Sequence, residues 1–174
     1  MTIAAPFWRQ IVPMAELVGG PHRFRLAPDA AQRAAAARLL GVEAIPFLQA
    51  ELSTRPWLDG VEVDGEIRAR LTQICSVSAD AFDAEVTAPV ALRIVPIGSP
   101  NAPPQVQGEH EIDLEADDPP DEADEIDLAG YVLELLAISL DPYPRKTGVT
   151  FEPPARDPTD SPFAALAALK QPKP

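Results

Sequence analysis

The segment from Phe82 to Ile94 is the clearest strand pattern in this chain, and it limits the folds that the chain can adopt. Its even-numbered positions are all apolar, and most of its odd-numbered positions are polar. Because successive side chains of a strand point to opposite faces of a sheet, the alternation predicts a strand with one buried face. Pro89 falls on the outer face and lacks an amide donor, which favours a place at a sheet edge or bulge.

Further strands are predicted before it. They cover residues 7–12, 22–26, 47–53, 61–63 and 66–77. Gly19-Gly20-Pro21 predicts a turn that joins the first two strands into a hairpin, and Asp64-Gly65 predicts a tight hairpin between residues 61–63 and 66–77.

Two helices are expected among these strands. Asp29-Ala30-Ala31-Gln32 has the form of a capping box, and the Ala-rich run that follows ends at Gly41, which suits the left-handed position after a helix. Asp127 fits the N-cap of a second helix, whose apolar stripe is formed by Leu128, Tyr131, Val132, Leu135 and Leu136. The prolines of Asp141-Pro142-Tyr143-Pro144 stop this helix by about Leu140.

Together these elements predict an α+β domain over residues 1–145, a curved antiparallel β-sheet with packed helices. The pattern leaves open whether the sheet closes into a barrel. Residues 146–174 are expected to form an extended tail with a short helix at residues 162–170, because Ser161 suits the N-cap and Pro162 the first helical position. Phe163 and Leu166 share one face of that helix, and we expect it to order on a partner.

Charge is distributed very unevenly. Residues 95–144 contain thirteen Asp and Glu and no Lys or Arg, so this stretch accounts for the whole net charge of −13. A surface that binds phosphates needs the opposite sign, since Lys and Arg contacts dominate affinity for nucleic acid. The acidic stretch therefore indicates that any action near RNA goes through a basic protein partner.

The acidic stretch also has an internal order. Residues 96–124 are rich in Pro and acids and poor in large apolar residues, which predicts a mobile insertion. Residues 110–115 alternate polar and apolar side chains and could add a short edge strand.

The residues give little support for catalysis or metal binding. Two histidines and one cysteine, Cys75, lie far apart in the sequence, and no phosphate-binding or nucleophile-elbow motif is present. We therefore expect no cofactor, no metal and no enzymatic activity, although nuclease-like chemistry stays open. One cysteine, no run of about eighteen apolar residues and no secretory pattern at the start predict a cytoplasmic protein that does not enter a membrane.

Three segments together resemble the YceD family, which is implicated in accumulation of large-subunit (23S) ribosomal RNA. They are Ile126-Asp127-Leu128, Asp141-Pro142-Tyr143-Pro144-Arg145 and the run Ser161-Pro162-Phe163-Ala164-Ala165-Leu166-Ala167-Ala168-Leu169-Lys170. The form with Asp-Pro-Tyr-Pro-Arg is similar to the alphaproteobacterial branch. Many members carry a C-x-x-C pair after the strand that here reads Thr72-Gln73-Ile74-Cys75, but this chain has Ser78 at the second position. The resemblance implies a role in ribosome biogenesis, without an established activity.

Two functions follow as hypotheses. The first is a non-enzymatic assembly factor whose acidic surface binds a basic ribosomal protein or a pre-ribosomal particle. Its candidate binding residues are Asp117, Asp118, Asp121, Glu122, Asp124, Glu134, Tyr143, Arg145, Phe163 and Leu166. The second is direct RNA binding or processing by arginines gathered on one side of the sheet: Arg9, Arg23, Arg25, Arg68 and Arg70.

Overall fold

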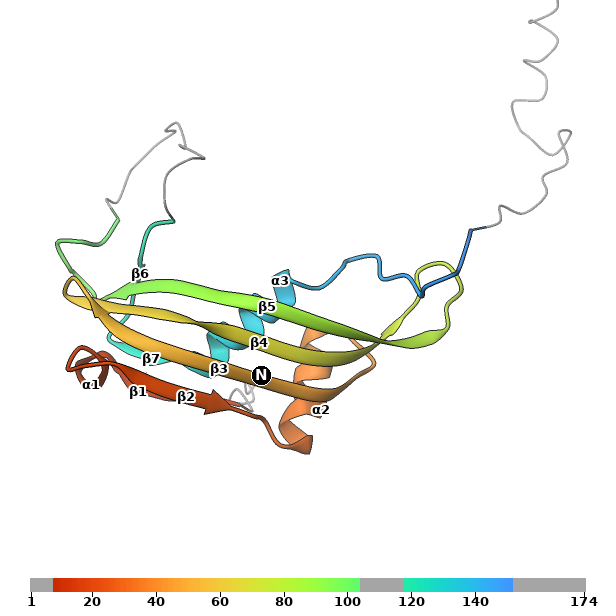
Figure 1. Ribbon diagram of the computed structural model, residues 1–174, viewed down its shortest axis with the longest axis horizontal. Helices are drawn as coiled ribbons and strands as arrows, with labels where there is room; N and C mark the ends of the chain where they lie inside the picture. The colour runs from red at the N-terminus through yellow and green to blue at the C-terminus, as the bar shows by residue number, and fades with distance from the viewer. Residues whose placement is uncertain (1–7, 104–117, 152–174) are drawn as a thin grey trace, which may run out of the picture.

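The computed structural model describes residues 8–103 and 118–151, and within them it confirms a mixed α+β fold. Its main sheet is open and has the strand order β2-β3-β4-β5-β6 (Figure 1). These strands are β2 (His22–Leu26), β3 (Ala44–Trp57), β4 (Gly60–Ile74), β5 (Ala81–Val95) and β6 (Asp121–Glu122). All neighbouring pairs are antiparallel except β5 and β6, which are parallel.

The remaining elements are two short strands and three helices. β1 (Ile11–Pro13) pairs with β7 (Glu125–Asp127) in a separate two-stranded sheet. The helices are α1 (Met14–Leu17), α2 (Ala30–Leu40) and α3 (Leu128–Ile138). Both α2 and α3 lie behind the main sheet in the view of Figure 1, so the helices cover one face of it and leave the other open.

The core lies between the helices and the inner face of the sheet. On β4 the inner residues Val63, Ile67 and Leu71 are completely buried. Arg68 and Arg70, which lie between Ile67 and Leu71 and point to the outer face, are exposed. The predicted alternation on β5 is confirmed in the same way. Pro89 lies on a sheet edge. One side of β5 pairs with β4 along its whole length, and among the described residues the other side pairs with β6 only at Ile94 and Val95.

Both predicted helix caps are confirmed. At the start of α2, the Asp29 carboxylate accepts from the Gln32 amide, and the Gln32 side chain accepts from the Asp29 amide, each at 2.8 Å. Gly41 follows this helix with a φ of 69°, a left-handed conformation that favours glycine. At the start of α3, the Asp127 carboxylate accepts from Gly130 N–H. These contacts explain where the two longer helices begin.

The predicted hairpin between residues 7–12 and 22–26 is wrong. β1 pairs with β7, and β2 pairs with β3, while the short helix α1 follows β1 directly. Met14 and Leu17 of α1 are buried, so the segment that reads as the approach to a turn is drawn into the core. The turn predicted at Gly19-Gly20-Pro21 is present, but it leads from α1 into β2 and does not join two paired strands.

The predicted hairpin at Asp64-Gly65 is also wrong, because β4 runs through both residues without a break. The turn lies at Leu58 and Asp59, between β3 and β4, and Leu58 has a φ of 53°. Gly65 serves a different purpose. A Cβ at this position would collide with the backbone of Glu51 and Leu52 on β3, so glycine permits a close approach of two strands.

The predicted mobile insertion over residues 96–124 needs a correction at both ends. Ile97 N–H donates to the Asp124 carboxylate at 3.2 Å, and Gly98 N–H donates to the Glu122 carboxylate at 3.0 Å. Residues 121–122 form β6. The two ends of the segment are therefore tied to each other and to β5. The candidate strand at residues 110–115 and the candidate helix at residues 162–170 lie outside the described residues.

Candidate functional site

Four of the predicted binding residues gather at the end of the sheet where β5 finishes. They are Asp118, Asp121, Glu122 and Asp124, which we call the acidic end. β6 places Asp121 beside Ile94 and Glu122 beside Val95, and Ala123 N–H donates to Val95 O at 2.9 Å. Asp117, the fifth acidic candidate of this segment, lies outside the described residues.

Neutral hydrogen-bond donors hold three of the four carboxylates of the acidic end in place. Asp124 and Glu122 accept the two backbone amides described above, and Asp121 accepts the Tyr131 hydroxyl at 2.9 Å. Burial, followed by this bond to Asp121, raises the pKa of Tyr131. Within residues 8–103 and 118–151, no ion pair joins any of the four carboxylates to a Lys or Arg. The charges of Asp121, Glu122 and Asp124 are therefore positioned without an ion pair to the described part of the chain, while Asp118 lines a depression together with Arg93.

A further carboxylate lies at the same end, on the turn between β3 and β4. Asp59 accepts the Asn101 amide at 2.9 Å and the Ser99 hydroxyl at 2.7 Å. These two bonds, the amide first, hold the pKa of Asp59 below its usual value. Asp59 was missed by the sequence analysis, because its relation to the acidic stretch exists only in the folded sheet.

Of the other described candidates, Glu134 lies near Tyr131, the partner of Asp121, and its charge is a further, smaller cause of the raised Tyr131 pKa, whereas Tyr143 and Arg145 lie away from the acidic end. Glu134 is exposed on α3, and Tyr143 and Arg145 are exposed in the segment after it. That segment contacts the loop before β5, where Ser76 N–H donates to Pro144 O at 2.8 Å. Since β5 has 15 residues, this loop lies about 45 Å from the acidic end. The structure therefore does not bring the predicted residues into one site. Phe163 and Leu166 lie outside the described residues.

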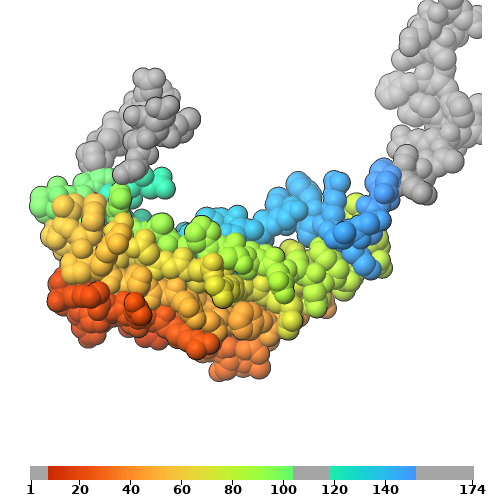
Figure 2. Space-filling view, viewed as in Figure 1, coloured from red at the N-terminus to blue at the C-terminus, as the bar shows by residue number. Residues whose placement is uncertain are grey.

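Four of the five arginines of the RNA hypothesis share the open outer face of the sheet. This is the face turned toward the viewer in Figure 2. Arg9 does not, because it forms an ion pair with Asp127 at 2.9 Å. The outer face carries six arginines and as many carboxylates: Arg23, Arg25, Arg55, Arg68, Arg70 and Arg93 with Glu51, Glu62, Asp64, Glu66, Asp83 and Glu85. Its formal charge is therefore balanced.

Several of these arginines are paired with their neighbours. Arg55 lies 2.7 Å from Glu62 and 3.5 Å from Asp64, and Arg68 is paired with Glu66. The hydrogen bond from Arg55 is the main cause that lowers the pKa of Glu62. Arg93 lies 3.6 Å from the second oxygen of Glu62 and stacks 5.2 Å from the centre of the Trp57 ring. The outer face consequently carries a network of ion pairs rather than a continuous basic patch.

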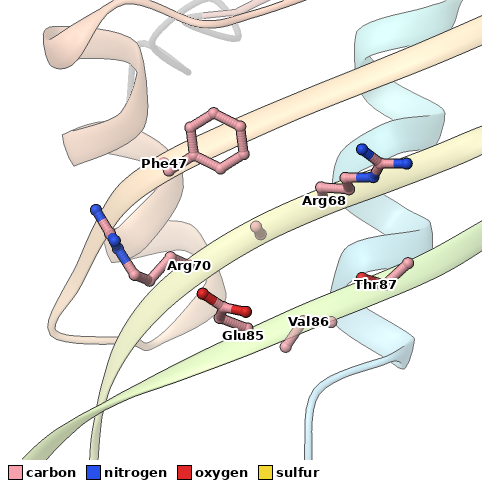
Figure 3. A pocket seen from close by; sticks show the side chains of 7 residues that line it. Phe47, Arg68, Arg70, Glu85, Val86 and Thr87 are labelled. Carbon is pink, nitrogen blue, oxygen red and sulfur yellow. The ribbon is translucent and has the colours of Figure 1, made fainter.

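A hollow of about 310 Å³ lies within this network of ion pairs, near the start of β3 (Figure 3). Phe47 is 44% exposed there and lies directly across from Arg70, whose other neighbour is Glu85. Arg70 makes no ion pair or hydrogen bond with the described residues. The sequence analysis missed Phe47 as a surface residue. Its spacing of two, four and six residues from Gln49, Glu51 and Ser53 places it on the polar face.

Cys75 is buried immediately after the end of β4. Its sulfur accepts the amides of Val77 and Ser78 at 3.5 Å and that of Lys146 at 3.4 Å. The Ser78 hydroxyl, followed by these amides, lowers the pKa of the thiol to about 6. Ser78, at the second position of the family pair, thus acts as a hydrogen-bonding partner of the sulfur. The contacts join the β4–β5 loop to the segment after α3.

The described residues contain no group of three or more His, Cys, Asp or Glu side chains arranged to hold a metal ion. Among the same residues, no helix has the length and apolar character needed to cross a bilayer. Comparison of the chain with protein-family models, with curated proteins and with solved structures finds no match.

Proposed function

We propose that this protein is a non-enzymatic ribosome-biogenesis factor of the YceD family that supports accumulation of large-subunit (23S) ribosomal RNA in the cytoplasm. It acts by binding a basic ribosomal protein, or a protein-rich face of a pre-ribosomal particle, through the acidic end. The observation that carries the proposal is the set of four carboxylates at one end of the sheet, three of them held by neutral donors, with no cation of the described residues in an ion pair with any of the four.

Electrostatics gives this arrangement a defined role. The net charge of −13 comes entirely from residues 95–144, and a concentrated charge of one sign raises the rate at which an oppositely charged partner arrives. The backbone and hydroxyl bonds keep the carboxylates oriented before the partner binds, so less ordering is needed on association. A basic protein whose fold needs shielding from premature contact with RNA is a suitable partner for such a surface.

The test uses the proteins of the large ribosomal subunit after their RNA has been removed. The full-length protein is immobilised and exposed to this mixture at low and moderate salt, with RNase added throughout. We expect retention of a few basic ribosomal proteins that weakens as salt increases, because the attraction between exposed charges is screened. Retention of ribosomal material only in the absence of RNase would contradict the proposal and favour RNA as the direct ligand.

Direct RNA binding remains the second candidate because of the hollow at Phe47. An exposed aromatic ring next to an arginine that has no partner among the described residues is the combination that stacks on and contacts single-stranded RNA. The balanced charge of the surrounding outer face opposes it, since carboxylates at Glu66 and Glu85 would repel a phosphate backbone. The protein-partner proposal is favoured for this reason.

A double variant separates the two candidates. Phe47→Ala with Arg70→Gln removes the stacking surface of the ring and the positive charge of the guanidinium, and neither side chain is buried. If RNA is the ligand, the affinity for purified large-subunit RNA falls by at least about tenfold. If a basic protein is the ligand, retention of ribosomal proteins stays at the wild-type level.

A further inference from the structure

A groove of about 570 Å³ lies at the end of the sheet opposite the acidic end. Three elements meet around it: the C-terminal end of α2, the last residues of β4 and the segment that follows α3. Leu40, Val42 and Leu140 supply apolar walls, and each packs only in part against the core. These side chains therefore leave apolar surface facing the groove, enough to receive an apolar side chain from a ligand.

The side-chain amide of Gln73 is a polar group that the groove offers to a ligand. Gln73 is 92% buried on the inner face of β4, where it lines the groove. Its side chain makes no hydrogen bond with any residue of the ranges 8–103 and 118–151. Among the described residues, Thr54 Oγ1 is the side-chain polar atom that is fully enclosed without a partner, so the amide atoms of Gln73 keep some exposure, and Gln73 lines the groove. An amide carries both a donor and an acceptor, which matches the N–H and C=O of an extended peptide backbone.

The charge around the groove is negative. Glu43 and Asp141 lie on its rim, and none of its lining residues is Lys or Arg. The Asp141 carboxylate accepts only the Tyr143 amide of its own loop among the described residues, at 2.8 Å, and Glu43 has no ion pair there.

The ends of two helices add to this potential. Both α2 and α3 have 11 residues and finish at the groove, and the C-terminal end of a helix is partially negative. Arg38 in the last turn of α2 offsets part of this, and it shares a neighbouring depression with Glu43, whereas α3 has no basic residue in its last turn. A cation is therefore favoured next to an apolar side chain.

We propose that this groove binds an extended segment of a basic partner protein, with an apolar side chain against Leu40, Val42 and Leu140, a Lys or Arg beside Glu43 and Asp141, and a backbone amide paired with Gln73. The inference rests on the proposed function in taking the partner to be basic. It adds a short-range site, about 45 Å from the acidic end, that holds one segment of the partner after long-range attraction has brought it close.

The probe is a synthetic peptide in which Lys and Leu alternate, added to isotope-labelled full-length protein. We expect the side-chain NH₂ resonances of Gln73 and the backbone amides of Val42 and Leu140 to shift. Peptides that alternate Glu with Leu, or Lys with Ser, are expected to bind at least about tenfold more weakly, which corresponds to about 1.4 kcal/mol. Shifts confined to other residues, including those of the acidic end, would overturn the proposal.

Two variants measure the contribution of the groove. Glu43→Lys with Asp141→Asn removes its negative rim while keeping an oxygen that can accept the Tyr143 amide, and we expect at least about a tenfold loss of peptide affinity. The matched control, Glu16→Lys with Glu85→Gln, makes the same change in net charge at exposed positions away from the groove and should leave the affinity unchanged. Equal losses in both variants would mean that peptide binding reflects net charge alone.

Gln73→Met keeps the length of the side chain and removes the amide. We expect a thermal midpoint close to that of the wild type, because the amide makes no hydrogen bond with the described residues, together with a several-fold weaker affinity for the Lys/Leu peptide. A lower midpoint with unchanged affinity would show that the amide serves the fold and not a ligand.

The failure of this inference can be distinguished from failure of the proposed function. If the groove variants retain ribosomal proteins as the wild type does, while neutralising the acidic end abolishes retention, the groove proposal is wrong and the proposed function stands. If no ribosomal protein is retained by the wild type while the Lys/Leu peptide still shifts Gln73, the proposed function is wrong and the groove takes a basic segment of another protein.

Discussion

The two faces of the main sheet differ in what holds their side chains. On the inner face, Val63, Ile67 and Leu71 of β4 are fully buried beneath the helices. On the outer face, the side chains that alternate with them form ion pairs in solvent, as between Arg55 and Glu62. Exposed ion pairs contribute little to folding, whereas each buried aliphatic side chain contributes about 1.5–3 kcal/mol. The fold therefore depends on one face, and the other face and the two ends of the sheet are free to bind.

The largest expected effect comes from placing the same residue on each face. Leu71→Gln buries an unpaired amide where an apolar side chain was completely enclosed, and should lower the free energy of unfolding by about 3 kcal/mol. Arg70→Gln, at the neighbouring exposed position, should change it by less than about 0.5 kcal/mol. Urea denaturation of both variants measures the difference. Similar losses would show that the outer face also carries the fold.

A second comparison concerns the closeness of β3 and β4. Gly65→Val introduces a side chain that meets the backbone of Glu51 and Leu52, and should cost about 2 kcal/mol or more. Thr87→Val, on the exposed outer face of β5, introduces the same residue at an open position and should change stability by less than about 0.5 kcal/mol. Thermal unfolding of the pair is the measurement. A neutral Gly65→Val would mean that the strands separate readily.

How far the sequence predicted this fold depends on the range of the interaction. The alternation of β5 and the two helix caps were correct, because strand faces and caps depend on residues that are close in the chain. Gly65 was misread as a turn residue, since the backbone it approaches, Glu51 to Leu52, is brought near only by the β3–β4 register.

The candidate site shows the same limit. The acidic residues could be named from the sequence, but Asp59 and the groove at Gln73 could not, because each depends on segments that meet only in the folded chain. The outward position of Phe47 could have been predicted, because it lies an even number of residues before the polar side chains of Gln49, Glu51 and Ser53 on β3.

A smaller effect is expected where polar contacts attach the helical layer to the rest of the protein. The Asp127 carboxylate caps α3, accepts the Gln10 amide at 2.9 Å and pairs with Arg9, so Asp127→Ala should cost about 1.5–2 kcal/mol. Asp29→Ala, which removes only a capping box, should cost about 1 kcal/mol. Chemical denaturation checks this order, and the reverse order would contradict the assignment of three contacts to Asp127.

The last comparison concerns Cys75, where the measurement is a titration. Ser78→Ala removes the main hydrogen bond to the sulfur, so the pKa of the thiol should rise from about 6 toward its ordinary value. Because the folded-state pKa is lowered, the stability that it provides is complete above the ordinary thiol pKa and is lost as the pH falls through about 6. Thiolate absorbance against pH measures the shift, and an unchanged titration in Ser78→Ala would contradict the assigned cause.

The most direct test of the central claim is the rate at which a retained ribosomal protein associates with the acidic end. Asp118, Asp121, Glu122 and Asp124 are replaced together by Asn or Gln, which keep oxygens able to accept the bonds from Ile97, Gly98 and Tyr131. The control replaces four carboxylates of the outer face, Glu51, Glu66, Asp83 and Glu85, in the same way. We expect the first variant to associate at least about tenfold more slowly at low salt, with an unchanged melting temperature, and the control to associate at nearly the wild-type rate. Equal rates for the two variants would contradict the account.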